Sequence, residues 1–402
     1  MSDIGAHGQI LANKGSLDPL MLRVGGARVV MLGAASHGTH DYHHWRAEIT
    51  RRLVAEHGFS FVAVEGDWSD CDRVDASVRG GGADPRAALG AFERWPTWMW
   101  ANEEVGDFLA WLRWWNGDHR VGFHGLDVYG LWESLHAILA YLGGHDPAAI
   151  PAASAAFDTF EPFHGYAGPL VPDSAGPEVV SLLAYLRRHA VEHAAERGRT
   201  EFSAWLGADI VPGAERYYRA MLAGDRSRDL RAAHMADTLD RLLDHYGPGS
   251  RGVVWAHNSH VGDARATDTG VASLGELARR RHGADAVVLV GFGCHRGDVL
   301  AAPRWGSAAQ VMTVPPARAG SVEDLLHGSA PERALFVFPR VDQPRWLTDA
   351  HDHRGIGVVR DPGGADYVTG RLGQWYDAFC WFNHTTPVHT VTREREIYPS
   401  GV

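Results

Sequence analysis

The sequence contains little cysteine and almost no lysine. Its three cysteines, Cys71, Cys294 and Cys380, stand far apart and form no CxxC pair, which excludes a disulfide framework and a cysteine-based structural zinc site. Lys14 is the only lysine, and it precedes the first predicted strand. Because Schiff-base, pyridoxal and Walker-type chemistry each need a lysine in the site, we expect none of them here.

Signals for other common classes of protein are also missing. No GxGxxG follows a predicted strand and no GxSxG occurs, so the dinucleotide-binding fold and the serine-hydrolase elbow lack their signatures. No apolar stretch approaches the length of a membrane span, and residues 1–15 lack the basic start and apolar centre of a signal peptide. The net charge of −11 argues against a nucleic-acid or membrane surface. We therefore expect a cytoplasmic protein that binds a small-molecule substrate, in an oligomeric state that the sequence leaves open.

The clearest local pattern is a strand, a turn and a helix near the N-terminus. Val29–Leu32 is too short for a helix and fits a strand buried on both faces, and the chain then turns at Gly33 and brings His37 to the end of that strand. Apolar residues follow at the spacing of a helix packed on a sheet: Tyr42, Trp45, Ile49 and Leu53.

Similar strand patterns along the chain predict an α/β fold, with a three-layer α/β/α core and a mostly parallel sheet. Further buried strands are expected over residues 59–64, 120–123, 252–256, 286–290, 335–338, 355–359 and 378–382. Strand signals vanish between the strands expected over 120–123 and 252–256, where helical periodicity appears over residues 132–142, 179–196, 214–223 and 231–243. We therefore predict a core over residues 1–146, an α-helical insertion forming a cap over 147–246, and the second part of the core over 247–402.

Two further segments have a predicted role in packing. Residues 1–25 are expected to form a short helix or arm that covers the sheet. Residues 92–115 are dense in tryptophan and show helical spacing over 108–115, which is typical of core. The alternative is that some of these rings form the wall of a pocket for an apolar or sugar-like ligand.

Ionisable residues follow the predicted strands on their carboxyl sides, where open α/β sheets bind ligands. If the sheet is mostly parallel, these residues share one rim: His37, Glu65, Asp67, His124, Asp127, His257, His260 and His295. From the insertion, we expect residues 215–219 and 231–234, including Arg231 and His234, to face the same crevice. Each residue also has a simpler interpretation, as a structural histidine, a solvated loop acid or an exposed helix charge. The rim as a whole is our predicted site.

The residues around this rim resemble the erythromycin esterase family, which includes proteins annotated for succinoglycan biosynthesis. The resemblance extends from about residue 20 to residue 395 and rests on these motifs: Leu32-Gly-x-x-Ser-His-Gly-Thr39, Arg46-x-x-Ile-Thr-Arg51, Val62-Ala-Val-Glu-x-Asp-Trp68, Pro96-Thr-Trp-Met-Trp-Ala-Asn102, Trp255-Ala-His-Asn-x-His-Val261 and Val290-Gly-Phe-Gly293. It implies the same three-layer fold with a helical insertion, and hydrolysis of a macrolide lactone ester. In the family, the first-turn histidine is taken as the general base, a role that carries over to His37. The family's arginine, acid and histidines carry over to Arg46, Glu65, His257 and His260.

Two positions depart from the family pattern. The family turn is typically Gly-Glu-x-x-His-Gly, but Ala34 stands at the glutamate position here. The helical motif usually has Arg-Asp followed by Met, whereas Arg231 is followed by Ala232. Both departures remove a carboxylate, and loss of an acid that orients a catalytic histidine can cost on the order of a thousandfold in rate.

Three functional hypotheses follow from these residues. The first is a hydrolase of an ester or lactone, in which His37 is the base, Glu65 or Asp67 replaces the missing orienting acid, and Arg46 and Arg231 hold substrate oxygens. The second is a non-hydrolytic enzyme of secondary metabolism on the same scaffold, such as a lyase, cyclase or acyl-transfer enzyme. The third is a catalytically inactive protein that binds such a ligand. We expect no cofactor, although His37, His257 and His260 could hold a zinc-like ion.

Overall fold

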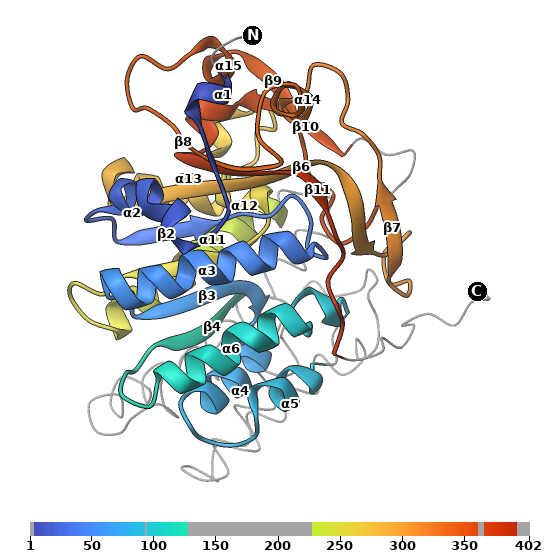
Figure 1. Ribbon diagram of the computed structural model, residues 1–402. Coiled ribbons are helices and arrows are strands. Elements are labelled where there is room, and N and C mark those ends of the chain that lie inside the picture. The colour runs from blue at the N-terminus through green and yellow to red at the C-terminus, as the bar shows by residue number, and fades with distance from the viewer. Residues whose placement is uncertain (1–3, 93–94, 128–226, 361–365, 392–402) are drawn as a thin grey trace, which may run out of the picture. The chain divides into compact units, whose positions relative to one another are not determined.

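The computed structural model describes residues 4–92, 95–127, 227–360 and 366–391 (Figure 1). The chain divides into two compact units, which we describe separately. The first contains Met1–Glu65, Arg73–His124 and Leu242–Val402, and the second contains Gly66–Asp72 and Gly125–Arg241.

A mixed, mostly parallel sheet forms the centre of the fold. Among the described residues nine strands belong to it, in the order β1-β8-β11-β6-β2-β5-β3-β4, with β7 paired to β6 off this path. These strands are β1 (Gly8–Ile10), β2 (Val29–Leu32), β3 (Phe61–Asp67), β4 (Gly122–Asp127), β5 (Gly252–Trp255), β6 (Val287–Ala301), β7 (Gln310–Val314), β8 (Arg333–Val337) and β11 (Ala378–Thr385). The pairs β2/β5, β2/β6, β3/β5 and β6/β11 are parallel, whereas β1, β7 and β8 pair antiparallel with their neighbours. A separate antiparallel pair consists of β9 (Ala350–Arg354) and β10 (Tyr367–Arg371).

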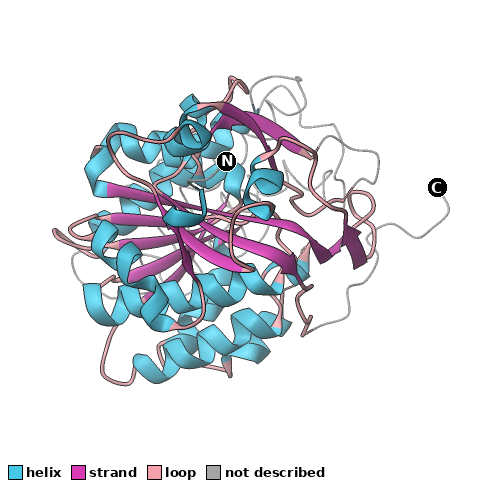
Figure 2. Cartoon of the chain, turned by 45° about the horizontal axis from the view of Figure 1, so that its top comes forward, coloured by secondary structure: helices cyan, strands magenta, loops and turns pink. Residues whose placement is uncertain are grey.

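Helices lie on both faces of this sheet, as Figure 2 shows. The α-helices are α1 (Ile4–His7), α2 (Asp18–Val24), α3 (His40–His57), α4 (Trp68–Val78), α5 (Pro85–Gly90), α6 (Glu103–Trp115), α11 (Ser227–His245), α12 (Asn258–Val261), α13 (Leu274–His282), α14 (Val322–His327), α15 (Arg345–Thr348) and α16 (Leu372–Trp375). Short 3₁₀ turns are η1 (Lys14–Leu17), η2 (Thr97–Met99), η5 (Ala264–Ala266) and η6 (Ala284–Ala286). The predicted α/β fold with a mostly parallel sheet is confirmed.

The first strand, turn and helix form as the sequence predicts. All four residues of β2 are buried, because β2 lies between β5 and β6 in the middle of the sheet. Helix α3 buries its predicted stripe of Tyr42, Trp45, Ile49 and Leu53. Tyr42 lies edge-on to Phe292 of β6, with the ring centroids 5.8 Å apart, so the helix packs directly on the sheet. Burial of such rings supplies much of the free energy that holds the layers together.

The tryptophan-rich segment is mostly core. Trp98 is completely buried and Trp100 is nearly so, while Trp114 on α6 is 73% exposed. The predicted helix over 108–115 is the second half of α6, which begins at Glu103 with Asn102 as its N-cap. The Asn102 side chain accepts a hydrogen bond from the Val105 N–H, which satisfies one of the donors left open at a helix start.

Strand β6 is longer than predicted and runs through the Gly-Phe-Gly segment, which resembles a turn in the sequence. The glycines serve close packing instead: a Cβ on Gly291 would lie 2.8 Å from the rings of Phe379 and Tyr376, and one on Gly293 would lie 2.7 Å from Phe379. The strand continues because its second half pairs with β11 and then with β7. His295 therefore lies inside a strand and does not follow one, contrary to prediction.

Two other predictions of strand positions need correction. β4 extends to Asp127, so His124 and Asp127 belong to the strand and do not lie beyond it. Residues 355–359 form no regular strand; they make isolated bridges, Ser36 to Gly357 and Ala302 to Val359. This segment crosses the first turn, because the Ile356 N–H donates to the Ala35 carbonyl and the His37 N–H donates to the Gly357 carbonyl.

Most of the predicted helical cap lies outside the described residues, including the helices expected over 179–196 and 214–223, and so does the core helix expected over 132–142. The helix expected over 231–243 lies within α11. The predicted domain limits at 146 and 246 stay a prediction. Within the predicted arm over 1–25, residues 4–24 contain α1, β1, η1 and α2, and β1 adds an edge strand beside β8. Within the described part of the chain, none of the helices combines the length and apolar character needed to cross a membrane.

Candidate active site

The strand order brings three of the predicted polar positions together. β2, β5 and β3 are adjacent and parallel, and Leu32 and Val64 are both in register with Trp255. The residues just beyond these positions therefore lie at the same end of the three strands. They are His37 in the turn after β2, His257 at the start of α12 and Glu65 in β3.

Glu65 lies at the centre of a cluster of histidines. One carboxylate oxygen, Oε2, accepts the backbone N–H of His257 at 2.7 Å and lies 4.0 Å from Nε2 of His37. The other, Oε1, lies 3.2 Å from Nε2 of His260. The side chains of His37 and Glu65 are each 6% exposed and that of His260 is 19% exposed, so His260 is the most open of the three to solvent. The four predicted catalytic residues thus form one buried group.

Burial keeps the imidazoles of His37 and His257 neutral. Desolvation lowers the pKa of His37 well below its usual value, and the nearby Glu65 carboxylate only partly opposes this shift. Desolvation likewise lowers the pKa of His257 to about 4. The two rings lie with their centroids 5.2 Å apart. At neutral pH both rings can therefore accept a proton.

The tautomer of His257 follows from its contacts. The Ser259 N–H lies 3.2 Å from His257 Nδ1 and donates to it, and the Ser259 hydroxyl lies 2.9 Å from the same atom. A neutral imidazole that accepts at Nδ1 carries its proton on Nε2. This Nε2 is buried, and no described acceptor meets the geometry of a full hydrogen bond with it. The Ala35 backbone is a weaker partner of the ring and favours its protonated form. A bound oxygen atom would therefore take the Nε2–H in competition with Ala35.

Arg46 is completely buried behind the cluster. Its Nε donates to the Gly33 carbonyl at 2.7 Å and its Nη2 to the Ala256 carbonyl at 2.5 Å, so one guanidinium holds the ends of β2 and β5. Desolvation lowers the pKa of Arg46 to about 9, and Glu65 opposes that shift. Arg46 was predicted to bind substrate. Two of its five N–H donors bind the backbone, whereas its buried Nη1 has no hydrogen-bond partner among the described residues.

The turn that carries His37 is fixed from several sides. His43, one turn into α3, donates from Nε2 to the His37 carbonyl at 3.0 Å. A Cβ on Gly33 would lie 2.1 Å from Oδ1 of Asn258, so this position requires glycine. Ala34 is completely buried, and its carbonyl accepts the Asn258 N–H at 2.8 Å. The methyl group at the family's glutamate position is thus part of the packed turn.

Sequence reasoning missed a buried polar chain behind this turn. The Asn258 amide bonds the backbone of Phe292 and lies 3.1 Å from Nε2 of His353, whose Nδ1 lies 2.6 Å from Glu323. Asn258 belongs to the Trp-Ala-His-Asn motif and could have been found there. His353 and Glu323 lie far along the chain in segments without a motif, and only the fold brings them to Asn258.

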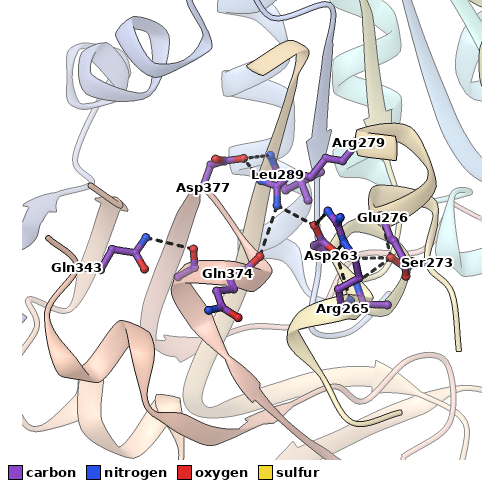
Figure 3. Close-up of polar contacts among 12 residues, drawn as sticks. Asp263, Arg265, Ser273, Glu276, Arg279, Leu289, Gln343, Gln374 and Asp377 are labelled. Carbon is purple, nitrogen blue, oxygen red and sulfur yellow. Dashed lines mark hydrogen bonds and ion pairs between the residues drawn. The ribbon is translucent and has the colours of Figure 1, made fainter. Parts of the chain in front are cut away.

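The segment after His260 is anchored by charged residues of the same unit (Figure 3). Arg279 of α13 donates to Asp263 at 3.2 Å and to Asp377 at 2.6 Å, and Asp377 also accepts the Leu289 N–H of β6 at 2.8 Å. The Ser273 hydroxyl donates to the Gly262 carbonyl at 2.6 Å. Asp263 and its neighbours therefore hold the histidine-bearing loop against β6 and do not extend the histidine cluster.

Two other predicted residues of the first unit have partners of their own. His124 lies 2.8 Å from the Tyr246 hydroxyl, which also bonds Arg79. His295 stacks on His327 of α14, with the ring centroids 3.7 Å apart and the planes 5° apart. Neither contact involves the cluster around Glu65.

The remaining predicted residues belong to the second unit. Arg231 forms a bidentate ion pair with Asp127, with Nε to Oδ1 at 2.9 Å and Nη2 to Oδ2 at 2.5 Å. His234 is buried on α11 and lies 3.4 Å from the Thr238 hydroxyl. Asp67 ends β3 in this unit. Their contacts with substrate stay predictions.

A family model described as erythromycin esterase matches residues 54–385, which include Glu65, His257 and His260. Similar solved structures include a succinoglycan biosynthesis protein, with 19% identity, a TM-score of 0.75 and 96% of each chain covered. A protein from Bacillus cereus has 18% identity and a TM-score of 0.77, covering 96% of this chain and 97% of its own. A mutant of the erythromycin esterase EreC in its open conformation has 14% identity and a TM-score of 0.66, with 96% of each chain covered. Identities this low establish similarity of fold.

Proposed function

The chain belongs to the erythromycin esterase family, and on that premise we propose that it hydrolyses an ester or lactone bond of a small natural-product-like molecule, with His37 as the general base. Membership of the family supports an esterase-like enzyme at a coarse level. The observation that carries the finer proposal is the buried group of His37, Glu65, His257 and His260 at the ends of three adjacent parallel strands.

In this mechanism His37 removes a proton from water. Its lowered pKa leaves the ring uncharged at neutral pH, as a general base must be, and the Glu65 carboxylate raises that pKa and so strengthens the base. The resulting hydroxide attacks the acyl carbon, and the carbonyl oxygen becomes an oxyanion. The protonated His37 then returns its proton to the departing alkoxide, which gives one carboxylic acid and one alcohol.

Glu65 would stabilise the imidazolium that forms on His37. At 4.0 Å from Nε2 its carboxylate is beyond hydrogen-bond distance but close enough for a strong charge interaction in a buried site. In this role Glu65 substitutes for the carboxylate that Ala34 lacks. His260, 3.2 Å from the same carboxylate and nearer to solvent, would pass protons between the cluster and water.

His257 would donate to the oxyanion. Its Nε2–H is buried and makes no full hydrogen bond in the described part of the chain, with the Ala35 backbone as its competing partner, and a donor already fixed in place stabilises developing negative charge without reorganising. Removal of one such donor typically costs about a hundred- to a thousandfold in kcat.

The test is incubation with a panel of aryl esters and macrolides in water enriched in oxygen-18. Hydrolysis incorporates one labelled oxygen into the product carboxylate, whereas a lyase gives an alkene and an unlabelled acid. We expect label incorporation by the native protein, its loss in His37→Ala, and normal activity in His119→Ala, which alters an exposed histidine on the loop after α6.

The non-hydrolytic alternative rests on the buried methyl of Ala34. If the native protein fails to hydrolyse every substrate and Ala34→Glu gains hydrolysis, the alternative is favoured and the alanine is the cause. If His37→Ala changes neither turnover nor ligand binding, the assignment of the site is wrong.

A further inference from the structure

Two further histidines meet at a carboxylate near the start of α3, three residues along the chain from His37. The cluster consists of His40, the first residue of α3, Glu104 in the first turn of α6, and His389 in the chain after β11. The Nδ1 atoms of His40 and His389 lie 2.7 Å and 3.0 Å from the same carboxylate oxygen, Oε1 of Glu104. Two imidazoles from distant segments thus converge on a single oxygen.

Backbone contacts fix these three positions. The His40 N–H donates to the Thr386 carbonyl at 2.9 Å, and the Glu103 N–H donates to the His389 carbonyl at 2.8 Å. Isolated bridges also join Thr39 to Pro387 and Asn102 to Thr390. The segment containing His389 is therefore attached to the starts of both helices, and the three side chains are brought together before any ligand binds.

The donor set matches the preferences of zinc. Zinc in proteins is held by imidazole nitrogens and carboxylate oxygens, and sites with three protein ligands keep one open position. The ligand atoms of the three residues all lie within 4.8 Å of one another. A tetrahedral site with bonds of about 2.0–2.1 Å holds neighbouring ligand atoms about 3.3 Å apart. Both nitrogens would therefore move a few tenths of an ångström away from Oε1, while the ligand atoms that now lie up to 4.8 Å apart would close in.

Exposure and charge also suit a cation. The His389 side chain is 74% exposed and that of His40 is 38% exposed, so an ion can enter from solvent, while Glu104 is buried at 5%. The neighbouring carboxylate of Asp41 already has partners of its own: it accepts a hydrogen bond from the Thr386 N–H and lies 3.7 Å from the Arg333 guanidinium. The Glu104 carboxylate supplies a buried negative charge at the centre of the cluster.

We propose that His40, Glu104 and His389 bind one divalent transition-metal ion of the zinc type. Among the described residues, this is the set of three metal-ligating side chains that lie close enough together to share an ion. The ion would clamp the segment after β11 to the starts of α3 and α6. The site uses none of the residues proposed for hydrolysis, so it does not depend on that proposal.

The proposal is tested with metal-free full-length protein titrated with Co²⁺, whose visible absorption reports four-coordinate binding, followed by displacement with Zn²⁺. We expect one Co²⁺ per chain. Because losing a partner that only orients a metal ligand costs 10–100-fold in affinity, losing a ligand in His389→Ala should cost on the order of a hundredfold or more. His384→Ala is the matched control, since His384 is also exposed and lies five residues earlier.

A further variant separates this site from the cluster around Glu65. His257→Ala should leave Co²⁺ binding unchanged, whereas Glu104→Gln should weaken it as His389→Ala does. The proposal is overturned if the native protein binds neither Co²⁺ nor Zn²⁺ at micromolar concentration. It is equally overturned if His389→Ala and His384→Ala bind alike, or if His257→Ala is the variant that loses the ion.

Discussion

Glu65 is the residue on which the charge of the histidine cluster depends. Its carboxylate holds the His257 backbone at 2.7 Å, lies 3.2 Å from His260, and raises the pKa values of His37 and His257 against the effect of burial. A single carboxylate therefore acts on three imidazoles. The effect of its charge can be tested separately from the effect of its size, because glutamine has nearly the same shape as glutamate and carries no charge.

We expect Glu65→Gln to reduce kcat about a hundredfold or more, in the range usual for loss of acid–base assistance. Without the carboxylate the pKa of His37 falls further, so the acidic limb of the kcat/KM profile should move to lower pH while its plateau drops. The measurement is a pH–rate profile with an aryl ester. Asp67→Asn is the control, and if that variant shows the shift and Glu65→Gln does not, Asp67 is the acid that assists His37.

Helix α3 contributes to the site as a structural element. Arg46, one of its fully buried residues, holds the carbonyls of Gly33 and Ala256, and His43 holds the carbonyl of His37. The helix begins at His40, directly after the turn that it braces. The position of His37 thus depends on side chains one or more turns into the helix.

We expect Arg46→Met to lower the free energy of unfolding by about 3 kcal/mol. It leaves two buried carbonyls without their donors and removes a buried positive charge that interacts with Glu65. Arg52→Met, six residues along the same helix, should cost about 1 kcal/mol or less, because Arg52 pairs with the exposed carboxylates of Glu56 and Asp18. Urea unfolding of both variants provides the comparison, and equal losses would show that the buried position of Arg46 has no special importance.

At the scale of the whole molecule, the chain after β11 is attached through Glu104. Hydrogen bonds from His40 and His389 lower the pKa of Glu104 to about 2 despite its burial, and the Glu104 contact raises the pKa of His40. The two shifts describe one interaction. A depressed carboxylate pKa stabilises the fold above the unfolded value near 4.5 and loses that contribution as the pH falls toward 2.

We therefore expect Glu104→Gln to remove part of the acid sensitivity of the protein. In the presence of a chelator, native protein should lose about 1–2 kcal/mol more than the variant between about pH 5 and pH 3, after allowance for screening through the exposed imidazoles. Glu103→Gln is the control, because Glu103 forms only an exposed pair with Arg86. Parallel curves for native protein and Glu104→Gln would contradict the assignment.

Local pattern predicted most elements of the core. β2 and the stripe of α3 follow from continuous and helical apolar spacing, and His37, Glu65 and His257 were found because polar residues end apolar runs. The predicted end of β6 was wrong, because glycine occurs both in turns and where a strand packs closely against large side chains. Gly291 and Gly293 resemble a turn, but they make room for the rings of Phe379 and Tyr376 inside a long strand.

The sequence by itself determined that this is an α/β protein with histidines and an acid at strand ends, because burial and periodicity are local properties of the chain, and its motifs resembled those of the erythromycin esterase family. Only the tertiary structure decided which of those residues meet. The order β2-β5-β3 makes His37, His257 and Glu65 neighbours, whereas His124 pairs with Tyr246 and His295 with His327. Strand order depends on how the connections cross the sheet, and no local pattern encodes it. Local patterns also do not predict that His40, Glu104 and His389 lie together, because these residues come from three distant segments of the chain.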